Sequence, residues 1–291
     1  MDYIKQGDCM ELCKEIPDES IDMVLCDLPY GTTNCKWDSL IPLNDYVIVN
    51  GKRYEKEEYI LFQIKNNLTT YKEAEKIWNT KKNDGLWTHY KRIIKPNGAI
   101  VLFAQTPFDK ILGSSNHKML RYEWIWEKTQ ATGHYNAKKM PMKAHENILV
   151  FYKNLPTYNP QMTDGHEPVH TYTKYLDTQY KSEIYQKASC EVSGGGNTTR
   201  YPRSVITFPS DKQTSHLHPT QKPLDLCEYL IKTYTNEGEI ILDNCMGSGT
   251  TCVAALNTGR HYIGFEQEEN YFNIAKERIN KAKEILCKKG K

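Results

Sequence analysis

Hydrophobic residues in this chain gather in short continuous runs that alternate with longer stretches of mixed polarity. Five segments built around such runs are predicted as buried strands: residues 21–26, 97–103, 145–152, 239–242 and 261–265. Apolar residues at helical spacing predict amphipathic helices at 227–234 and 271–286. A further helix is expected from residue 84 to 94, closed by Lys95-Pro96-Asn97-Gly98. Strands that alternate with helices in this way predict an α/β fold.

A Gly-rich turn, Asp243-Asn244-Cys245-Met246-Gly247-Ser248-Gly249-Thr250-Thr251, joins the strand at 239–242 to a short helix at 251–256. Glycines let the backbone approach a ligand closely, and a helix start offers unpaired N–H groups. Cys252 stands where a dinucleotide fingerprint needs its third Gly, and the turn lacks the Lys of a P-loop. Glu266 ends the next strand, where a carboxylate usually holds a ribose diol. An ordinary tight turn is the alternative, but Glu266 favours a nucleoside-containing ligand without a phosphate chain.

The run Asp27-Leu28-Pro29-Tyr30 follows the strand at residues 21–26, at the end where open α/β sheets place their ligands. Pro29 keeps Leu28 extended, so that the Leu28 carbonyl can point outward. Asp27 adds a second acceptor and Tyr30 a flat face, which suits a planar base with an exocyclic NH2 group. Accepting both N–H hydrogens frees the nitrogen lone pair for attack on an electrophilic methyl group. For the tetrapeptide alone, a plain Pro-centred turn is the alternative.

The order of the two motifs, with the Asp27 run first and the Gly turn last, resembles the beta class of amino-group DNA methyltransferases. The tetrapeptide of this chain, with Leu28 at its second position, is similar to that of phage-like members. Further segments resemble that family in the same order along nearly the whole chain: residues 6–8, 97–103, 145–152 and 218–223. The resemblance implies a Rossmann-like, doubly wound α/β sheet of the S-adenosylmethionine-dependent methyltransferases, with an inserted target-recognition region.

This resemblance also implies an activity, a cofactor and a set of site residues. The expected reaction is methyl transfer from S-adenosylmethionine to adenine N6 at a specific sequence of duplex DNA, with the base flipped out. Asp27, Leu28, Pro29 and Tyr30 would hold the base, Glu266 the ribose hydroxyls and Asp8 the adenine of the cofactor, with no metal needed. The full predicted cofactor set is Asp8, Cys9, Asp27, Lys222, Asp243, Cys245, Gly247, Ser248, Gly249, Thr250, Thr251, Glu266 and Gln267.

Other activities stay open from the sequence. Adenine is favoured over cytosine N4 because Asp27 opens the tetrapeptide, where the cytosine enzymes more often carry Ser. An RNA or protein amide nitrogen and a catalytically inactive DNA-binding regulatory protein are further alternatives. The chain also departs from the family at Asn244 and Cys245, which stand where Pro and Phe are usual. Cys245, Met246 or Phe265 is expected to supply the missing apolar wall of the cofactor pocket.

The segments divide the chain into three predicted regions. Residues 1–152 form the catalytic half, 153–216 the target-recognition region, and 217–291 the cofactor-binding half. An insertion at about 45–83 opens with an alternating run around Asn50-Gly51, a hairpin signal, followed by a Lys/Glu-rich helix. This insertion could cap the site, contact DNA, mediate dimer contacts or have a purely structural role. The recognition region includes Ser193-Gly194-Gly195-Gly196-Asn197, which is predicted to be a flexible link.

Composition narrows the partners and the compartment. The chain has 291 residues and a net charge of only +2, so DNA contact requires a local basic patch. Residues 131–222 carry eleven Lys/Arg against seven Asp/Glu, which suits phosphate and base-edge contact, although a solvated loop region is the alternative. Nine cysteines without a Cys-x-x-Cys pair argue against zinc. With neither a signal peptide nor a membrane span, we expect a cytoplasmic protein of a bacterial or phage-infected cell. Its expected partner is duplex DNA, with a homodimer and a cognate restriction endonuclease left open.

Overall fold

The computed structural model describes residues 2–31, 38–175, 191–210 and 221–289. The chain divides into two compact units, which are described separately. The main unit comprises Met1–Asn159 and Ser204–Lys291, and the second unit comprises Pro160–Arg203.

The main unit is built on a sheet that has eight strands among the described residues, in the order β1-β12-β11-β2-β5-β7-β6-β10. The strands are β1 (Tyr3–Gln6), β2 (Ile21–Asp27), β5 (Ile94–Ala104), β6 (Leu120–Thr132), β7 (Lys143–Phe151), β10 (Val205–Phe208), β11 (Ile240–Asp243) and β12 (His261–Glu266). In this order across the sheet, the neighbouring pairs β1-β12, β12-β11, β11-β2 and β2-β5 are parallel. By contrast, β7 runs antiparallel to both β5 and β6. The α/β prediction is confirmed, and β2 lies beside β11 although the two are far apart in the sequence.

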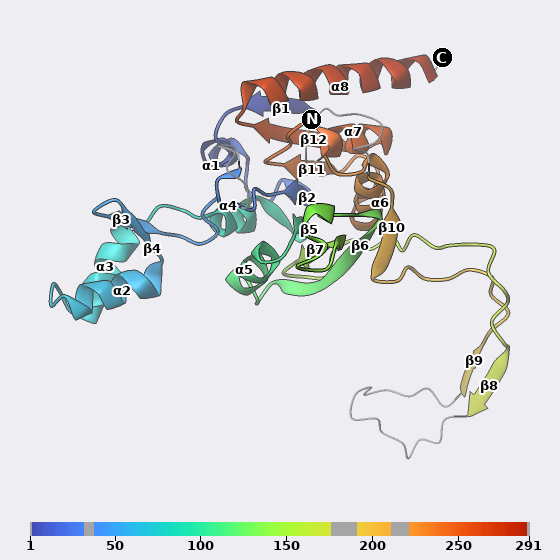
Figure 1. Ribbon diagram of the computed structural model, residues 1–291, viewed down its shortest axis with the longest axis horizontal. Coiled ribbons are helices and arrows are strands. Elements are labelled where there is room, and N and C mark those ends of the chain that lie inside the picture. Colours follow the sequence, from blue (N-terminus) through green and yellow to red (C-terminus); the bar gives the residue numbers. More distant parts are fainter. Residues whose placement is uncertain (1, 32–37, 176–190, 211–220, 290–291) are drawn as a thin grey trace. The chain divides into compact units, whose positions relative to one another are not determined.

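Helices cover both faces of this sheet (Figure 1). One face carries α1 (Cys9–Leu12), α4 (Leu86–Ile93) and α5 (Phe108–Ser115); the other carries α6 (Leu224–Tyr234), α7 (Thr250–Asn257) and α8 (Glu269–Lys289). Side chains alternate between the faces of a strand, so Met23 and Leu25 of β2 join one core while Val24 and Cys26 join the other. This burial on both faces explains why the central strands read as continuous apolar runs. The sheet is therefore doubly wound, as predicted.

One boundary differs from the sequence prediction. Residues 95–98 were expected to end a helix, but β5 already begins at Ile94, which pairs with Ile21 across the sheet. Lys95 also donates to Asp22 Oδ1 at 2.7 Å. The pairing with β2 is interrupted between Ile94 and Ala99, so residues 95–98 form an irregular bulge within β5 and not the end of a helix.

The inserted segment folds as the predicted hairpin, followed by two helices where the sequence predicted one. They are β3 (Val47–Val49), β4 (Lys52–Tyr54), α2 (Lys56–Lys65) and α3 (Tyr71–Lys81), which lie side by side in Figure 1. Asn50 and Gly51 both have positive φ, as a tight two-residue hairpin turn requires. A small core of its own holds the segment together, formed by Val47, Tyr59, Ile60, Ala74 and Trp78.

The second unit contains an antiparallel pair, β8 (Tyr172–Tyr175) and β9 (Glu191–Gly194). The predicted flexible link is therefore partly wrong, because Gly194 belongs to β9 and Gly196 N donates to Val169 O at 2.6 Å. A Cβ on Gly195 would lie 2.3 Å from His170 O, so this glycine allows a close backbone approach. The target-recognition role of residues 153–216 stays a prediction.

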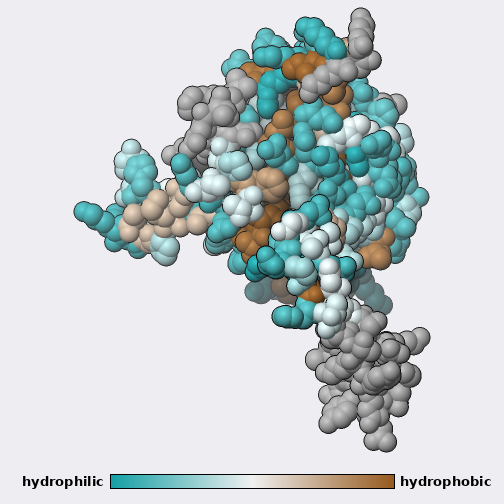
Figure 2. Space-filling view, turned by 90° about the vertical axis from the view of Figure 1, so that its right-hand side faces the viewer, coloured by the Kyte–Doolittle hydropathy of each residue, from teal (hydrophilic) through white to brown (hydrophobic). Residues whose placement is uncertain are grey.

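The surface of the main unit is mostly hydrophilic on the face shown in Figure 2, with hydrophobic residues gathered in small areas. None of the helices in the described parts of the chain combines the length and the apolar character that a membrane crossing needs.

Candidate active site

The carboxyl ends of three neighbouring parallel strands meet at one edge of the sheet. Asp27 ends β2, Asp243 ends β11 and Glu266 ends β12, and all three line one cavity of about 390 Å³. Ligand pockets are usually roughly 300–1,000 Å³ in volume. The cavity therefore has the size for a nucleoside-containing ligand at the position where open α/β sheets bind their ligands.

The structure brings nearly all of the predicted site residues into the lining of this cavity. They are Asp8, Cys9, Asp27, Leu28, Pro29, Tyr30, Lys222, Asp243, Cys245, Gly247, Ser248, Thr250, Thr251, Glu266 and Gln267. Gly249 is not in the lining. It has φ +79° at the start of α7, and a Cβ there would lie 2.9 Å from Ala275 Cβ, so it lets the turn pack against α8. The binding roles of these residues stay predictions.

Backbone N–H groups hold the carboxylates on the side of the Gly turn. Glu266 accepts hydrogen bonds from Gly247 N at 2.9 Å and from Glu268 N at 2.8 Å. Burial raises the pKa of Glu266 above its usual value, although these bonds oppose the shift. Each carboxylate oxygen retains further acceptor capacity, which suits a ribose diol.

Asp243 is more deeply buried than Glu266 and accepts a hydrogen bond from Cys245 N at 3.1 Å. Burial raises the pKa of Asp243 to about 7. Asp8 begins α1 and accepts from Met10 N at 2.8 Å, which fixes it at the rim of the same cavity. Carboxylates of this kind suit the hydroxyl and amino donors of S-adenosylmethionine.

Cys245 and Met246, two of the three residues expected to supply the missing apolar wall, both line the cavity. Phe265 lies in the core with 1% of its surface exposed and is not part of the lining. Tyr271 at the start of α8 adds an aromatic side chain that sequence reasoning missed. Within the described ranges, no cluster of His, Cys, Asp and Glu is arranged to hold a metal ion.

The tetrapeptide that is predicted to be catalytic is held by Asp38 and by Phe108. Asp38 Oδ1 accepts hydrogen bonds from Tyr30 N at 2.8 Å and from Gly31 N at 2.9 Å. The ring of Phe108 stacks on Tyr30, with 5.3 Å between ring centroids. Tyr30 in turn donates its hydroxyl to Asp27 Oδ1 at 2.7 Å. The backbone, the ring and the hydroxyl of Tyr30 are thus all fixed.

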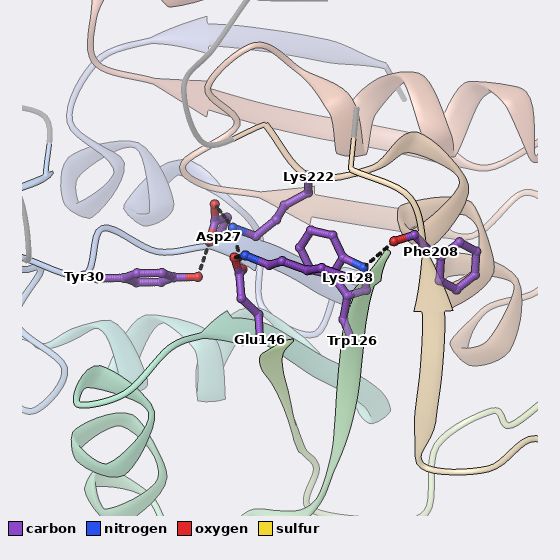
Figure 3. A network of polar contacts seen from close by, with 7 residues as sticks. All are labelled: Asp27, Tyr30, Trp126, Lys128, Glu146, Phe208 and Lys222. Carbon is purple, nitrogen blue, oxygen red and sulfur yellow. Dashed lines mark hydrogen bonds and ion pairs between the residues drawn. The ribbon is translucent and has the colours of Figure 1, made fainter. Parts of the chain in front are cut away.

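A chain of buried charges reaches Asp27 from the opposite side (Figure 3). Lys222 Nζ donates to Asp27 Oδ2 at 2.6 Å and lies 3.2 Å from Glu146 Oε2. Lys128 Nζ donates to Glu146 Oε1 at 2.6 Å. The predicted cofactor residue Lys222 therefore contacts Asp27, the predicted catalytic carboxylate, directly. His218, Pro219 and Thr220 of the same predicted segment lie outside the described residues.

Charge and burial act in opposite directions on the two carboxylates of this chain. Burial raises the pKa of Asp27 and the nearby charge of Glu146 adds to the rise, while Lys222 opposes it. Burial would also raise the pKa of Glu146, but the ammonium groups of Lys222 and Lys128 outweigh it and hold that pKa below its usual value. Glu146 is therefore the more firmly ionised of the two.

Sequence reasoning missed Glu146, Lys128 and Asp38. Glu146 belongs to the predicted strand at 145–152, but its charge was given no role, and Lys128 and Asp38 lie outside every motif. A carboxylate at the start of an otherwise apolar strand was an available signal for Glu146, since a buried charge needs a partner. Only the pairing of β6 with β7 identifies Lys128 as that partner.

Comparisons with known proteins agree with this geometry. The family model N6_N4_Mtase, described as a DNA methylase, matches residues 21–277. The type II methyltransferase M.HindIII of Haemophilus influenzae is 25% identical over 298 residues, covering 96% of this chain and 95% of that protein. M.HinfI, also of Haemophilus influenzae, is 24% identical over 294 residues (97% and 69%), and M2.MboI of Moraxella bovis is 26% identical over 291 residues (97% and 89%).

Solved structures share the fold. The complex of M1.HpyAVI with S-adenosylmethionine has a TM-score of 0.57 at 22% identity, covering 96% of this chain and 100% of that one. The cytosine-N4-specific PvuII DNA methyltransferase also has a TM-score of 0.57, at 15% identity, covering 97% of this chain and 90% of its own.

Proposed function

The chain belongs to the N6/N4 DNA methylase family and is an S-adenosylmethionine-dependent DNA methyltransferase that acts on an exocyclic amino group, and we propose that its target is adenine N6. This membership confirms the resemblance found in the sequence. The proposed reaction takes place at a specific site in duplex DNA, with the target base flipped into the cavity because its amino group is otherwise buried in the helix.

One observation carries the proposal. The tetrapeptide that begins at Asp27 and the Gly turn that begins at Asp243 line the same cavity. S-adenosylmethionine, when bound, supplies an electrophilic methyl group on its sulfonium. A base stacked on Tyr30 would place its NH2 group beside Asp27 and the Leu28 carbonyl. The two acceptors would orient the nitrogen lone pair, and much of the rate would come from this orientation.

The chemistry of Asp27 suits this role. Burial raises its pKa, which makes its carboxylate a stronger acceptor for an amine N–H than a solvated carboxylate. Tyr30 and Lys222 fix the two carboxylate oxygens from opposite sides, so the side chain is already oriented before a base arrives. Such preorganisation avoids reorienting the acceptor during the reaction.

Support for adenine over cytosine comes from Asp27 and from the family resemblance, since cytosine-N4 enzymes more often have Ser at that position. Mass spectrometry of nucleosides from duplex DNA treated with the purified protein and S-adenosylmethionine tests the proposal. We expect N6-methyladenine. Finding N4-methylcytosine alone would overturn the adenine assignment and leave the cofactor and the fold unaffected. DNA that gains no methyl group would favour the inactive, regulatory alternative.

Target choice is proposed to reside in residues 153–216, which are rich in Tyr and Thr. Exchanging this segment with that of a relative should move the methylated sequence and leave the modified atom unchanged. A chimaera that keeps the original sequence preference would place recognition elsewhere in the chain. The type II names of the relatives support a short specific target, and with it a restriction endonuclease of the same specificity. A homodimer remains a prediction, to be checked by sedimentation of the purified protein.

A further inference from the structure

Both oxygens of the proposed base acceptor are already engaged. Asp27 Oδ1 accepts from the Tyr30 hydroxyl, and Oδ2 accepts from the Lys222 ammonium at 2.6 Å. A hydrogen bond between an ammonium and a carboxylate is of the strong, charge-assisted kind. An incoming amino group is uncharged and competes poorly for the same oxygen. Oδ2 keeps a second lone pair, but its full release to the amine requires another partner for the Lys222 ammonium.

Glu146 offers that place. Its Oε2 atom is buried and accepts no hydrogen bond of good geometry from any described residue, yet Lys222 Nζ lies only 3.2 Å away. A buried acceptor without a hydrogen bond raises the free energy of the folded protein. Turning Lys222 from Asp27 to Glu146 would satisfy this oxygen at the moment when Asp27 Oδ2 is taken by the base.

The surroundings permit the exchange without exposing or creating a charge. Lys222 lies over the rings of Tyr30, at 5.6 Å from its centroid, and of Phe103, at 5.3 Å. Lys128 Nζ donates to the other Glu146 oxygen at 2.6 Å and has 9% of its side chain exposed. Two ammonium groups balance two carboxylates before and after the shift, which matters because an unpaired buried charge is costly.

We propose that Glu146 is a positioning residue which receives the Lys222 ammonium when the target base enters, so that Asp27 Oδ2 is free to accept the amine N–H. Lys128 anchors Glu146 for this purpose. The inference rests on the proposed role of Asp27 as base acceptor, and it assigns functions to a strand residue and a cation that the tetrapeptide and the Gly turn leave unexplained.

Glu146→Gln is the primary test, because it keeps the size of the side chain and removes its charge. Lys222 is then left with Asp27 as its ionic partner and holds Oδ2. We expect kcat to fall by about tenfold or more, a change of ~1.4 kcal/mol in the barrier. Cofactor affinity, measured by calorimetry, should stay unchanged, because Glu146 does not line the cavity.

A pH profile separates this role from a structural one. The ionisable groups that face Asp27 are Glu146, Lys222, Tyr30, Cys26 and Asp243. The charge of Glu146 raises the pKa of Asp27, so its removal lowers that pKa and should move the acid limb of kcat to lower pH. A loss of packing alone would lower activity without moving this limb.

Asp22→Asn is the matched control. Asp22 and Glu146 are both 9% exposed, and Lys95 donates to Asp22 at 2.7 Å as Lys128 does to Glu146 at 2.6 Å. Asp22 lies at the opposite end of β2 from Asp27. The control should lower the melting temperature and leave kcat and its acid limb unchanged.

The double variant Glu146→Gln/Lys128→Met decides between the two roles if the single variant is unstable. It removes both charges, so no unpaired cation stays buried. Recovery of stability with kcat still low supports the positioning role. Recovery of kcat to the wild-type level would show a structural ion pair and overturn the proposal, as would wild-type kcat and an unchanged acid limb in Glu146→Gln.

Failure of this inference is distinguishable from failure of the proposed function. The nucleoside product of the wild-type protein is identified in the same reactions. If the wild type forms N6-methyladenine and Glu146→Gln forms it at the same rate, only the role of Glu146 is wrong. If the wild type forms no N6-methyladenine, the adenine assignment itself is wrong.

Discussion

The two sides of the cavity hold their carboxylates by different means. On the side of the Gly turn, Glu266, Asp243 and Asp8 each accept hydrogen bonds from backbone N–H groups. On the side of the tetrapeptide that we propose to be catalytic (the catalytic side), Asp27 is held by the side chains of Tyr30 and Lys222. The first arrangement is fixed by local backbone geometry, while the second depends on charges that can exchange partners.

This difference predicts two kinds of behaviour. A change on the turn side removes an acceptor from a rigid frame, so it should appear as a loss of cofactor affinity or as a change in stability. A change on the catalytic side alters the partners of Asp27, so it should appear in the rate and in its pH dependence. Variants on the two sides should therefore separate these behaviours.

Asp27→Ala should have the largest effect. It removes one of the two acceptors that orient the amine, and a group in this position typically contributes roughly 10²–10⁴-fold to the rate. Single-turnover methylation of duplex DNA measures the loss, and calorimetry should show that S-adenosylmethionine still binds. Near-normal turnover in Asp27→Ala would remove Asp27 from the mechanism.

Asp243→Asn should change the pH dependence of stability. The pKa of Asp243 is raised to about 7 in the folded protein, against roughly 3.9 for an unfolded Asp. Between these values the folded state binds more protons than the unfolded state, so its contribution to stability falls as the pH rises from about 4 to 7. Relative to the wild type, the unliganded Asn variant should therefore gain up to a few kcal/mol between pH 5 and pH 8.

Urea unfolding of both proteins at the two pH values measures this difference. Subtracting the pH dependence of the variant's unfolding free energy from that of the wild type cancels the titration of the other groups, which the two proteins share. Equal pH slopes in the two proteins would show that Asp243 is not protonated more readily in the folded state.

The same division explains what the sequence could predict. The Gly turn, Glu266 and the tetrapeptide at Asp27 were found because each lies at the end of an apolar strand, and the partners of Glu266 and Asp243 are backbone groups that the turn itself supplies. Strands β2, β5, β7, β11 and β12 and helices α4, α6, α7 and α8 followed from the same local patterns, whereas β6, β10, α1 and α5 were not predicted. Residues 95–98 also differ, because they form an irregular bulge in β5 opposite β2.

The charged chain at Asp27 could not be found in this way. Lys222 and Asp27 are 195 residues apart, and Lys128 meets Glu146 only because β6 pairs with β7. Asp38 likewise reaches the backbone of Tyr30 from outside any motif. Side-chain contacts between distant strands leave no periodic signal in the sequence, so the structure is needed to assign them.

Glu266→Ala tests the turn side directly. Removing hydrogen bonds to a charged acceptor should weaken the binding of S-adenosylmethionine by ~1.5–3 kcal/mol, or roughly 10- to 100-fold. Glu266→Gln keeps an oxygen that can accept from Gly247 N and should lose less. Calorimetric affinity that is unchanged in the Ala variant would show that Glu266 does not contact the cofactor.

Tyr30 should give the smallest effect, and it separates the ring from the hydroxyl. Tyr30→Ala should lose base stacking worth ~1–3 kcal/mol, whereas Tyr30→Phe keeps the ring stacked on Phe108 and should retain substantial activity. The hydroxyl lowers the pKa of Asp27 by donating to it, so the Phe variant should move the acid limb of kcat to higher pH. Because Glu146→Gln should move the same limb to lower pH, opposite shifts in the two variants would identify Asp27 as the titrating group. Shifts in the same direction, or none in either variant, would show that another group sets the acid limb.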